Sequence, residues 1–115
     1  MTSLSGKTAE FIALQYLRLK GYSLVACNYI TGRGTGAGEV DIIVKNTHTL
    51  VFVEVKKRTD LTTAAYAIKP AQISRIRRGA EAFLMLHKEY TNYDIRFDAI
   101  LVESWLKIRH IENAF

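Results

Sequence analysis

The stretch from Gly38 to Arg58, GEVDIIVKNTHTLVFVEVKKR, constrains the fold of this chain more than any other. Two apolar runs flank a short polar segment, and this pattern predicts a β-hairpin. Side chains alternate between the two faces of a strand, which assigns each residue to a face. In the first arm, one face is expected to carry Val40, Ile42 and Val44 and the other Asp41, Ile43 and Lys45. In the second arm, one face is expected to carry Leu50, Phe52, Glu54 and Lys56 and the other Val51, Val53 and Val55.

The turn sets which residues of the two arms face each other. With a two-residue loop at positions 47–48, Asp41 lies opposite Glu54. Cross-strand neighbours are about 5 Å apart, so two carboxylates meet there with Lys56 beside them. Like charges at this distance oppose folding unless another group compensates them.

A divalent cation would compensate this pair. Mg²⁺ is usually held by one or two carboxylates together with water and phosphate oxygens, which fits Asp41 and Glu54, with the backbone carbonyl of Val55 as a third ligand. Lys56 would orient or activate a water, or steady charge that develops on a phosphate. The pattern indicates metal-assisted phosphodiester hydrolysis.

A plainer interpretation of the same residues is a solvated ion cluster, which contributes under about 1 kcal/mol. The surroundings favour the functional interpretation. Both strands are apolar on both faces, as expected of strands covered on both sides. Buried charges are rare unless they are paired or bind a metal.

Length and charge set the class of protein. The 115 residues predict one domain, 1–115, and the net charge of +5 favours a polyanionic partner. The single Cys27 cannot form an internal disulfide, which indicates a reducing compartment, and its apolar neighbours predict an ordinary core thiol. Neither a signal peptide nor an apolar run of about 20 residues is visible, so a soluble, cytoplasmic protein without a membrane partner is expected.

The first helix is expected from Gly6 to Lys20, with Ser5 or Thr8 as its cap and Gly21 as its stop. Glu10 projects at the margin of the apolar stripe. It either caps or salt-bridges within the helix or reaches the acidic cluster of the hairpin. The expected buried stripe consists of Ala9, Ile12, Ala13, Tyr16 and Leu17.

A strand is expected from Tyr22 to Ile30, followed by the glycine-rich segment TGRGTGAG. This segment lacks the endings of a P-loop and the spacing of a dinucleotide fingerprint. It is either a long exposed loop or a segment whose Arg33 closes on a phosphate backbone.

The second helix is expected from Pro70 to about Lys88, with Pro70 in its first turn. Gln72 lies close to the buried side and is expected to face the site, whereas His87 is expected to be a packed or partly exposed residue. Basic residues concentrate near the start of this helix and at the end of the hairpin, as either a solvated face or a phosphate-binding rim. They are Lys57, Arg58, Lys69, Arg75, Arg77 and Arg78.

Two final strands are expected at Ile95–Glu103 and Leu106–Ile111. Asp98 is interpreted as structural because Arg96 shares its face and would neutralise it. The order helix, strand, hairpin, helix, strand, strand predicts an α/β sandwich with a mixed sheet.

The motifs together resemble a known family. Glu10 on the first helix, Asp41 opening a hairpin strand and Glu54-Val55-Lys56 ending its partner are similar to the PD-(D/E)xK nuclease superfamily, with its restriction-endonuclease-like α/β/α fold. The sequence around these motifs is more specific and resembles the YraN-type family of small bacterial proteins, which is grouped near archaeal Holliday junction resolvases. This resemblance covers nearly the whole chain and is carried by TAEFIALQYLRLKGY, a following Asn, GEVDIIV, VFVEVKKR, AEAFL, RFDAILV and HIENAF.

The resemblance implies that Asp41 and Glu54 bind Mg²⁺ or Mn²⁺, that Lys56 is the catalytic lysine and that Glu10 is an auxiliary acid. Gln72 stands where relatives more often have Lys, which leaves its role open. The glycine-rich loop is longer than usual, which leaves the shape of the substrate open.

Three functions follow as hypotheses. The first is a metal-dependent DNA endonuclease, with branched or structured DNA as its candidate substrate. The second is a nucleic-acid-binding module of nuclease fold with little or no catalysis, and the third is a protein-interaction subunit with a structural acidic cluster. Symmetric cutting of two strands, as in a junction resolvase, would imply a homodimer.

Overall fold

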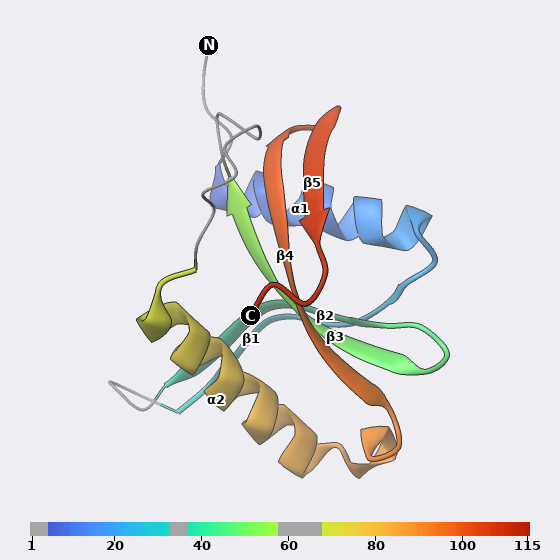
Figure 1. Ribbon diagram of the computed structural model, residues 1–115, viewed down its shortest axis with the longest axis vertical. Coiled ribbons are helices and arrows are strands. Elements are labelled where there is room, and N and C mark those ends of the chain that lie inside the picture. The colour runs from blue at the N-terminus through green and yellow to red at the C-terminus, as the bar shows by residue number, and fades with distance from the viewer. Residues whose placement is uncertain (1–4, 33–36, 58–67) are drawn as a thin grey trace.

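A five-stranded mixed sheet forms the centre of the molecule, with one α-helix packed on each face (Figure 1). The computed structural model describes residues 5–32, 37–57 and 68–115. The strands run in the order β1-β2-β3-β4-β5; β3 and β4 are parallel and the other neighbours antiparallel. The elements are α1 (Gly6–Leu19), β1 (Ser23–Thr31), β2 (Gly38–Lys45), β3 (Thr49–Lys57), α2 (Pro70–Leu86), the 3-10 helix η2 (Lys88–Tyr90), β4 (Asp94–Ser104) and β5 (Lys107–Ile111).

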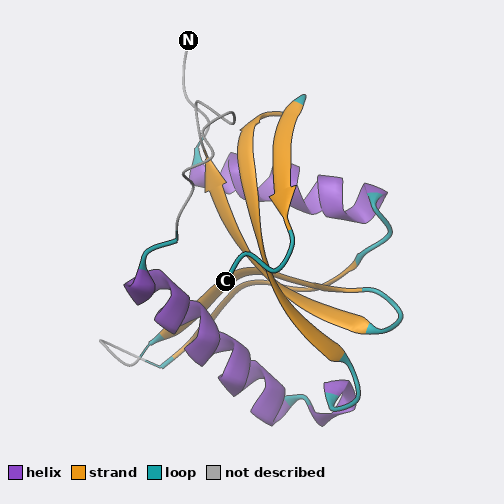
Figure 2. Cartoon of the chain, in the orientation of Figure 1, coloured by secondary structure: helices purple, strands orange, loops and turns teal. Residues whose placement is uncertain are grey.

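This architecture confirms the predicted α/β/α sandwich (Figure 2). The first helix begins after Ser5, whose hydroxyl accepts a hydrogen bond from the Thr8 backbone N–H at 3.1 Å. It ends before Gly21, whose φ of +98° is a left-handed conformation that suits glycine. The second helix starts with Pro70 in its first turn, as predicted, and ends at Leu86, two residues before the expected Lys88.

Two apolar cores lie on opposite sides of the sheet. One packs α1 against Ile42, Val44, Val51 and Val53, and the other packs α2 against Ile43, Leu50 and Phe52. The second hairpin arm therefore alternates as predicted. The first arm does not, because Val40 packs on the α2 side with Ile43 instead of sharing a face with Ile42 and Val44.

The prediction that Cys27 is a core thiol was wrong. Cys27 is exposed on β1, which is an edge strand paired only with β2. The alternation of β1 is broken by a register shift between Leu24 and Ala26 and by Asn28, whose φ is +51°. Apolar neighbours in the sequence therefore do not place Cys27 in the core.

No helix in the described parts of the chain is long and apolar enough to cross a membrane.

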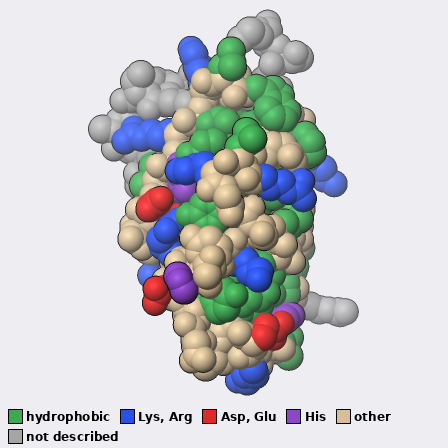
Figure 3. All heavy atoms as spheres, turned by 90° about the vertical axis from the view of Figure 1, so that its right-hand side faces the viewer, with side chains coloured by type: hydrophobic (Ala, Val, Ile, Leu, Met, Phe, Trp, Pro, Cys, Tyr) green, Lys and Arg blue, Asp and Glu red, His purple; other side chains and the backbone are tan. Residues whose placement is uncertain are grey.

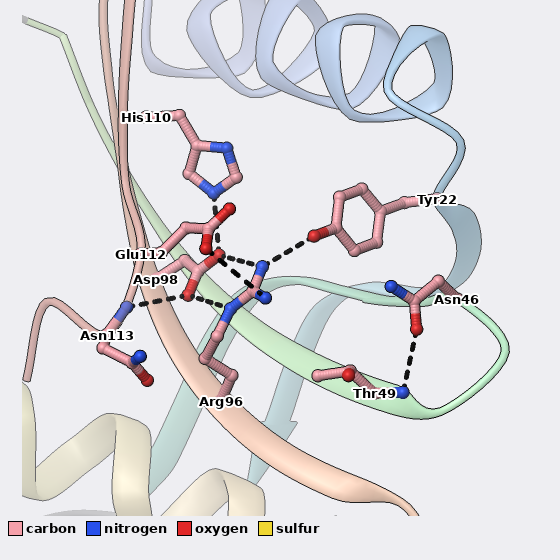
Figure 4. A network of polar contacts seen from close by, with 8 residues as sticks. All are labelled: Tyr22, Asn46, Thr49, Arg96, Asp98, His110, Glu112 and Asn113. Atoms are coloured by element: carbon pink, nitrogen blue, oxygen red, sulfur yellow. Dashed lines mark hydrogen bonds and ion pairs between the residues drawn. The ribbon is translucent and has the colours of Figure 1, made fainter.

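Asp98 is the centre of a buried network of hydrogen bonds and ion pairs (Figure 4). Its carboxylate is fully buried and accepts hydrogen bonds from the Arg96 guanidinium at 2.8 Å, from His110 Nε2 at 2.7 Å and from the Asn113 backbone N–H at 3.2 Å. Arg96 also donates to the Tyr22 hydroxyl at 2.7 Å. This network confirms the structural role expected for Asp98 and ties β4 to β5 and to the start of β1.

The pKa of Asp98 reflects this pairing. Burial by itself would raise the pKa, but the hydrogen bonds from His110 and Arg96 outweigh burial and hold the pKa below its ordinary value of 3.8. The carboxylate therefore stabilises the fold above pH 3.8, and this contribution is lost as the pH falls through the lower, folded-state pKa.

We predict that Asp98→Ala lowers the free energy of unfolding at neutral pH by about 3–5 kcal/mol, because it leaves Arg96 and His110 without their buried partner. Urea unfolding followed by circular dichroism measures this. Asp94→Ala, at an exposed carboxylate of the same strand, is the matched control and should change stability by less than about 0.5 kcal/mol. Equal effects of the two substitutions would contradict the role of the network.

Candidate active site

The β2–β3 hairpin places the two predicted metal ligands at one end of the sheet. Asn46 organises the turn, because its side-chain oxygen accepts hydrogen bonds from the backbone N–H groups of His48 at 3.0 Å and Thr49 at 2.9 Å. Figure 4 shows the bond from Thr49. The register from Lys45 opposite Leu50 to Ile42 opposite Val53 is the one predicted from a two-residue loop, and the predicted pair of Asp41 with Glu54 lies one residue beyond it.

Regular pairing of β2 with β3 ends at Ile42 opposite Val53. The next residue, Asp41, continues the contact through its side chain, since its Oδ2 accepts a hydrogen bond from the Val55 backbone N–H at 2.9 Å. The N–H and C=O of one strand residue point to the same side. The carbonyl of Val55 therefore points toward Asp41 and lies beyond the regular pairing of β2 with β3, as a third oxygen ligand requires.

A cavity of about 200 Å³ opens where these residues meet the first halves of α1 and α2. Four polar side chains predicted for the site, from α1, β2 and β3, lie in its wall, and so does Gln72 of α2. The lining residues are Glu10, Glu39, Asp41, Glu54, Val55, Lys56, Gln72, Arg75 and Ile76. The structure thus brings together every residue predicted to bind metal or to act in catalysis.

Glu54 is the buried acid of this cavity, with a side chain only 10% exposed. Burial, followed by a shared hydrogen bond and charge repulsion with Asp41, raises the pKa of Glu54 to about 8. Lys56 Nζ lies 3.4 Å from Glu54 Oε2 and partly offsets this rise. Such a pKa means that the protein alone compensates the negative charge of this carboxylate poorly. The carboxyl group is therefore a candidate functional group.

Glu10 reaches the acidic cluster from α1, which was one of the two alternatives left open by the sequence. Burial raises the pKa of Glu10, and the nearby carboxylate of Asp41 raises it further, whereas a hydrogen bond with the Asn28 side chain lowers it. Asn28 is a functional candidate that the sequence analysis missed. Its left-handed φ of +51° within a strand was not visible from the pattern.

The donor set fits a hard divalent cation. Two carboxylates, a backbone carbonyl and room for water and phosphate oxygens match the preference of Mg²⁺ or Mn²⁺ for oxygen ligands. No group of three His, Cys, Asp or Glu side chains among the described residues is arranged to hold a metal. A cation in this cavity would therefore depend on the backbone carbonyl and on exogenous ligands as well as on Asp41 and Glu54.

The basic rim is only partly assembled at the cavity. Arg75 lines the cavity and forms an ion pair with Glu39 at 2.6 Å. Arg78 Nε donates to the Ala37 carbonyl at 3.2 Å, and Lys69 precedes α2 as its N-terminal cap residue.

The other basic residues have different positions. Arg77 packs over the Phe97 ring, with 5.0 Å between its Cζ and the ring centroid, and so does not join the rim. Lys57 is exposed at the end of β3. Arg33 and Arg58 lie outside the described residues.

Two glycines hold α2 close to the start of β2, another feature that the sequence analysis missed. A Cβ atom added to Gly38 would lie 2.3 Å from the Gly79 backbone nitrogen. This close approach sets the position of α2, and with it Gln72 and Arg75, relative to Asp41. The sequence gives no sign of this contact, because it joins residues 41 positions apart.

The fold and the cavity define a small α/β sandwich protein with an acidic, lysine-containing site at one end of a mixed sheet. The model of the uncharacterised protein family UPF0102 matches residues 9–102, and the chain belongs to this family. This confirms the predicted YraN-type family.

Curated relatives cover nearly all of the chain. It is 44% identical to a UPF0102 protein of Paramagnetospirillum magneticum over 96% of its own length and 85% of that protein. It is 41% identical to one of Rhodopseudomonas palustris strain BisB18, covering 96% and 79% of the two chains. A relative from Nitrobacter winogradskyi is 40% identical, with 96% and 91% covered.

The raised pKa of Glu54 gives a testable dependence of stability on pH. Between pH 4.5 and about 8 the folded state holds this proton more tightly than the unfolded state, so stability falls as the pH rises through this window. We predict that Glu54→Gln, which removes the charge at nearly constant size, stabilises the metal-free protein above pH 8 by roughly 1–3 kcal/mol.

Thermal unfolding in EDTA measures this stabilisation. The gain should disappear below pH 4.5, where the carboxyl group of the native sequence is protonated in both the folded and the unfolded state. Glu81→Gln, at an exposed position of α2, is the control and should leave the melting temperature unchanged across the same range. A loss of stability in Glu54→Gln at every pH would show that the Lys56 pair outweighs the repulsion.

Proposed function

We propose that this protein is a metal-dependent endonuclease of the PD-(D/E)xK type that hydrolyses phosphodiester bonds in DNA. The observation that supports this proposal most is the convergence of Asp41, Glu54 and Lys56 on one cavity. The hairpin register alone does not require a lysine beside two opposed acids. Such an arrangement suits the binding of a cation and a phosphate together.

Asp41, Glu54 and the Val55 carbonyl would hold Mg²⁺ or Mn²⁺. Asp41 is already oriented by the hydrogen bond from Val55. The cation would supply Lewis-acid polarisation of the scissile phosphate and offset the repulsion that raises the pKa of Glu54.

The remaining side chains of the cavity have distinct roles in this proposal. The Lys56 ammonium group, 24% exposed, orients the attacking water or steadies charge that develops on the phosphate. Glu10 accepts a hydrogen bond from water, and its raised pKa suits the transfer of a proton. The Gln72 amide donates hydrogen bonds to a phosphate or water but cannot act as a proton donor in the way a lysine can.

A basic rim would carry the DNA backbone past this cavity. Arg75 stands at the wall of the cavity, and the net charge of the chain is +5. Arg33, Lys57, Arg58, Lys69 and Arg78 complete the proposed phosphate-binding set. Binding through phosphates predicts an affinity that falls steeply with salt concentration.

A second candidate function is a nucleic-acid-binding module with little or no catalysis. Gln72 favours this alternative, because a neutral amide occupies the part of the cavity nearest to α2, where a second lysine would assist phosphate chemistry. A homodimer remains a prediction that applies only if two strands are cut symmetrically.

We predict that the native protein cleaves DNA in the presence of Mg²⁺ or Mn²⁺ and that Asp41→Asn and Lys56→Ala each lower the rate by about 100-fold or more. Gel assays on branched, single-stranded and duplex substrates measure the cleavage. Lys88→Ala, at an exposed lysine of η2, is the matched control for loss of a positive charge and should cleave at the native rate. Inert native protein that still binds DNA would favour the binding module.

We also predict that Mn²⁺ raises the melting temperature of the native protein, since a ligand that binds only the folded state stabilises it. Glu54→Ala should lose this shift and Lys88→Ala should keep it. Differential scanning fluorimetry with increasing Mn²⁺ measures it. An equal shift in Glu54→Ala would place the cation elsewhere.

A further inference from the structure

Phe11 of α1 and Trp105 and Leu106 of the β4–β5 turn form an exposed apolar surface, called here the aromatic surface. Phe11 is 54% exposed, Trp105 is 55% exposed and Leu106 is 95% exposed. The rings of Phe11 and Trp105 meet edge to face, with centroids 5.9 Å apart and planes at 79°. This contact fixes the two rings against each other and leaves ring surface open to solvent. Large exposed side chains grouped in this way mark a binding site more often than scattered ones do.

The aromatic surface lies at the same end of the sheet as the cavity. Strands β3 and β4 are parallel, and Lys57 pairs with Val102, so Trp105 follows three residues beyond the end of β3. At about 3.3 Å per residue this is about 10 Å. Figure 1 shows the end of β3 and the β4–β5 turn at the upper end of the molecule. Phe11 directly follows Glu10, which lines the cavity.

The charges around the aromatic surface are mainly positive. Residues four and seven positions from Phe11 share its face of the helix, and these are Lys7 and Arg18, both exposed. Lys107 adjoins the turn and is 67% exposed, although Glu103 pairs with it at 3.2 Å. Figure 3 shows hydrophobic and basic side chains intermingled on the upper part of the face that it displays.

This combination fits a strand with unpaired bases better than a protein partner. Proteins that bind single strands combine basic groups for the phosphates with aromatic rings on which bases stack. The core of a protein interface is depleted of lysine, and three apolar side chains form only a small core. Duplex DNA offers little to these rings, because its bases already stack on one another.

We propose that the aromatic surface stacks unpaired bases of a DNA strand whose backbone continues into the neighbouring cavity. This inference rests on the proposed function and names its substrate class: DNA that contains single-stranded segments. Phe11 and Trp105 act here in binding and take no part in the chemistry.

Trp105 is the only tryptophan of the chain, so its fluorescence reports directly on this surface. The native protein in EDTA, where metal-dependent cleavage is blocked, is titrated with an oligothymidine strand, with a duplex of equal length and with heparin, a polyanion that has no bases. The oligothymidine strand should quench the emission strongly, and the duplex and heparin only weakly.

Affinities of the variants are measured by anisotropy of a labelled strand. Trp105→Ala and Phe11→Ala should each bind the single strand at least about fivefold more weakly and bind heparin as the native protein does. Leu19→Ala removes an apolar side chain that is 90% exposed near the other end of α1 and should bind like the native protein. Circular dichroism checks that each variant is folded.

Two results would overturn the inference. If Trp105→Ala binds the single strand as tightly as the native protein, charge alone holds the strand. If the emission instead changes with protein concentration and sedimentation shows a dimer that Trp105→Ala loses, the surface joins two copies of the chain.

The same variants separate this inference from the proposed function. Cleavage of DNA that does not depend on Trp105 or Phe11, with unchanged strand affinity, would remove the inference and leave the nuclease. Strand binding that depends on Trp105 in a protein without cleavage would remove the nuclease and keep the aromatic surface.

Discussion

The pairing of β2 with β3 is the constraint on which the rest of the structure depends. Side chains alternate along a strand, so a slip of one residue would turn every group of a strand to the opposite face. Asn46 fixes the turn through its side chain, and the fully buried Phe52 and Leu50 make any other register costly. The positions of Asp41 and Glu54 at the wall of the cavity follow from this register.

Two buried carboxylates show how the same residue class serves different purposes. Asp98 is surrounded by donors, and its pKa lies below the ordinary value. Glu54 shares a hydrogen bond with the like-charged Asp41 and forms an ion pair with Lys56, and its pKa is raised to about 8. The first arrangement is satisfied within the protein. The second costs stability in the metal-free protein, and carboxyl groups of this kind concentrate at functional sites. This contrast supports the cavity as the functional site and the Asp98 network as structure.

Local patterns were sufficient to predict the hairpin, both helices and the mixed sheet, because turn residues, caps and periodicity act over a few residues. They predicted that Gln72 faces the site and left open whether Glu10 reaches it; both residues line the cavity. They failed for Cys27 and Val40, where backbone irregularities interrupt the alternation. They could not identify the partnership of His110 with Asp98, because it joins two strands through their side chains and leaves no local signal.

The parallel pairing of β3 with β4 explains why α1 can serve two surfaces. Parallel strands end at the same edge of a sheet, so the cavity at the end of β3 and the turn after β4 lie beside each other. Since successive residues of a helix point about 100° apart, Glu10 can face the cavity while Phe11 meets Trp105. In the proposed function, a strand that stacks its bases on the rings would therefore lie close to the acids. The fold thus sets the distance between the two surfaces, and neighbouring side chains of one helical turn reach both of them.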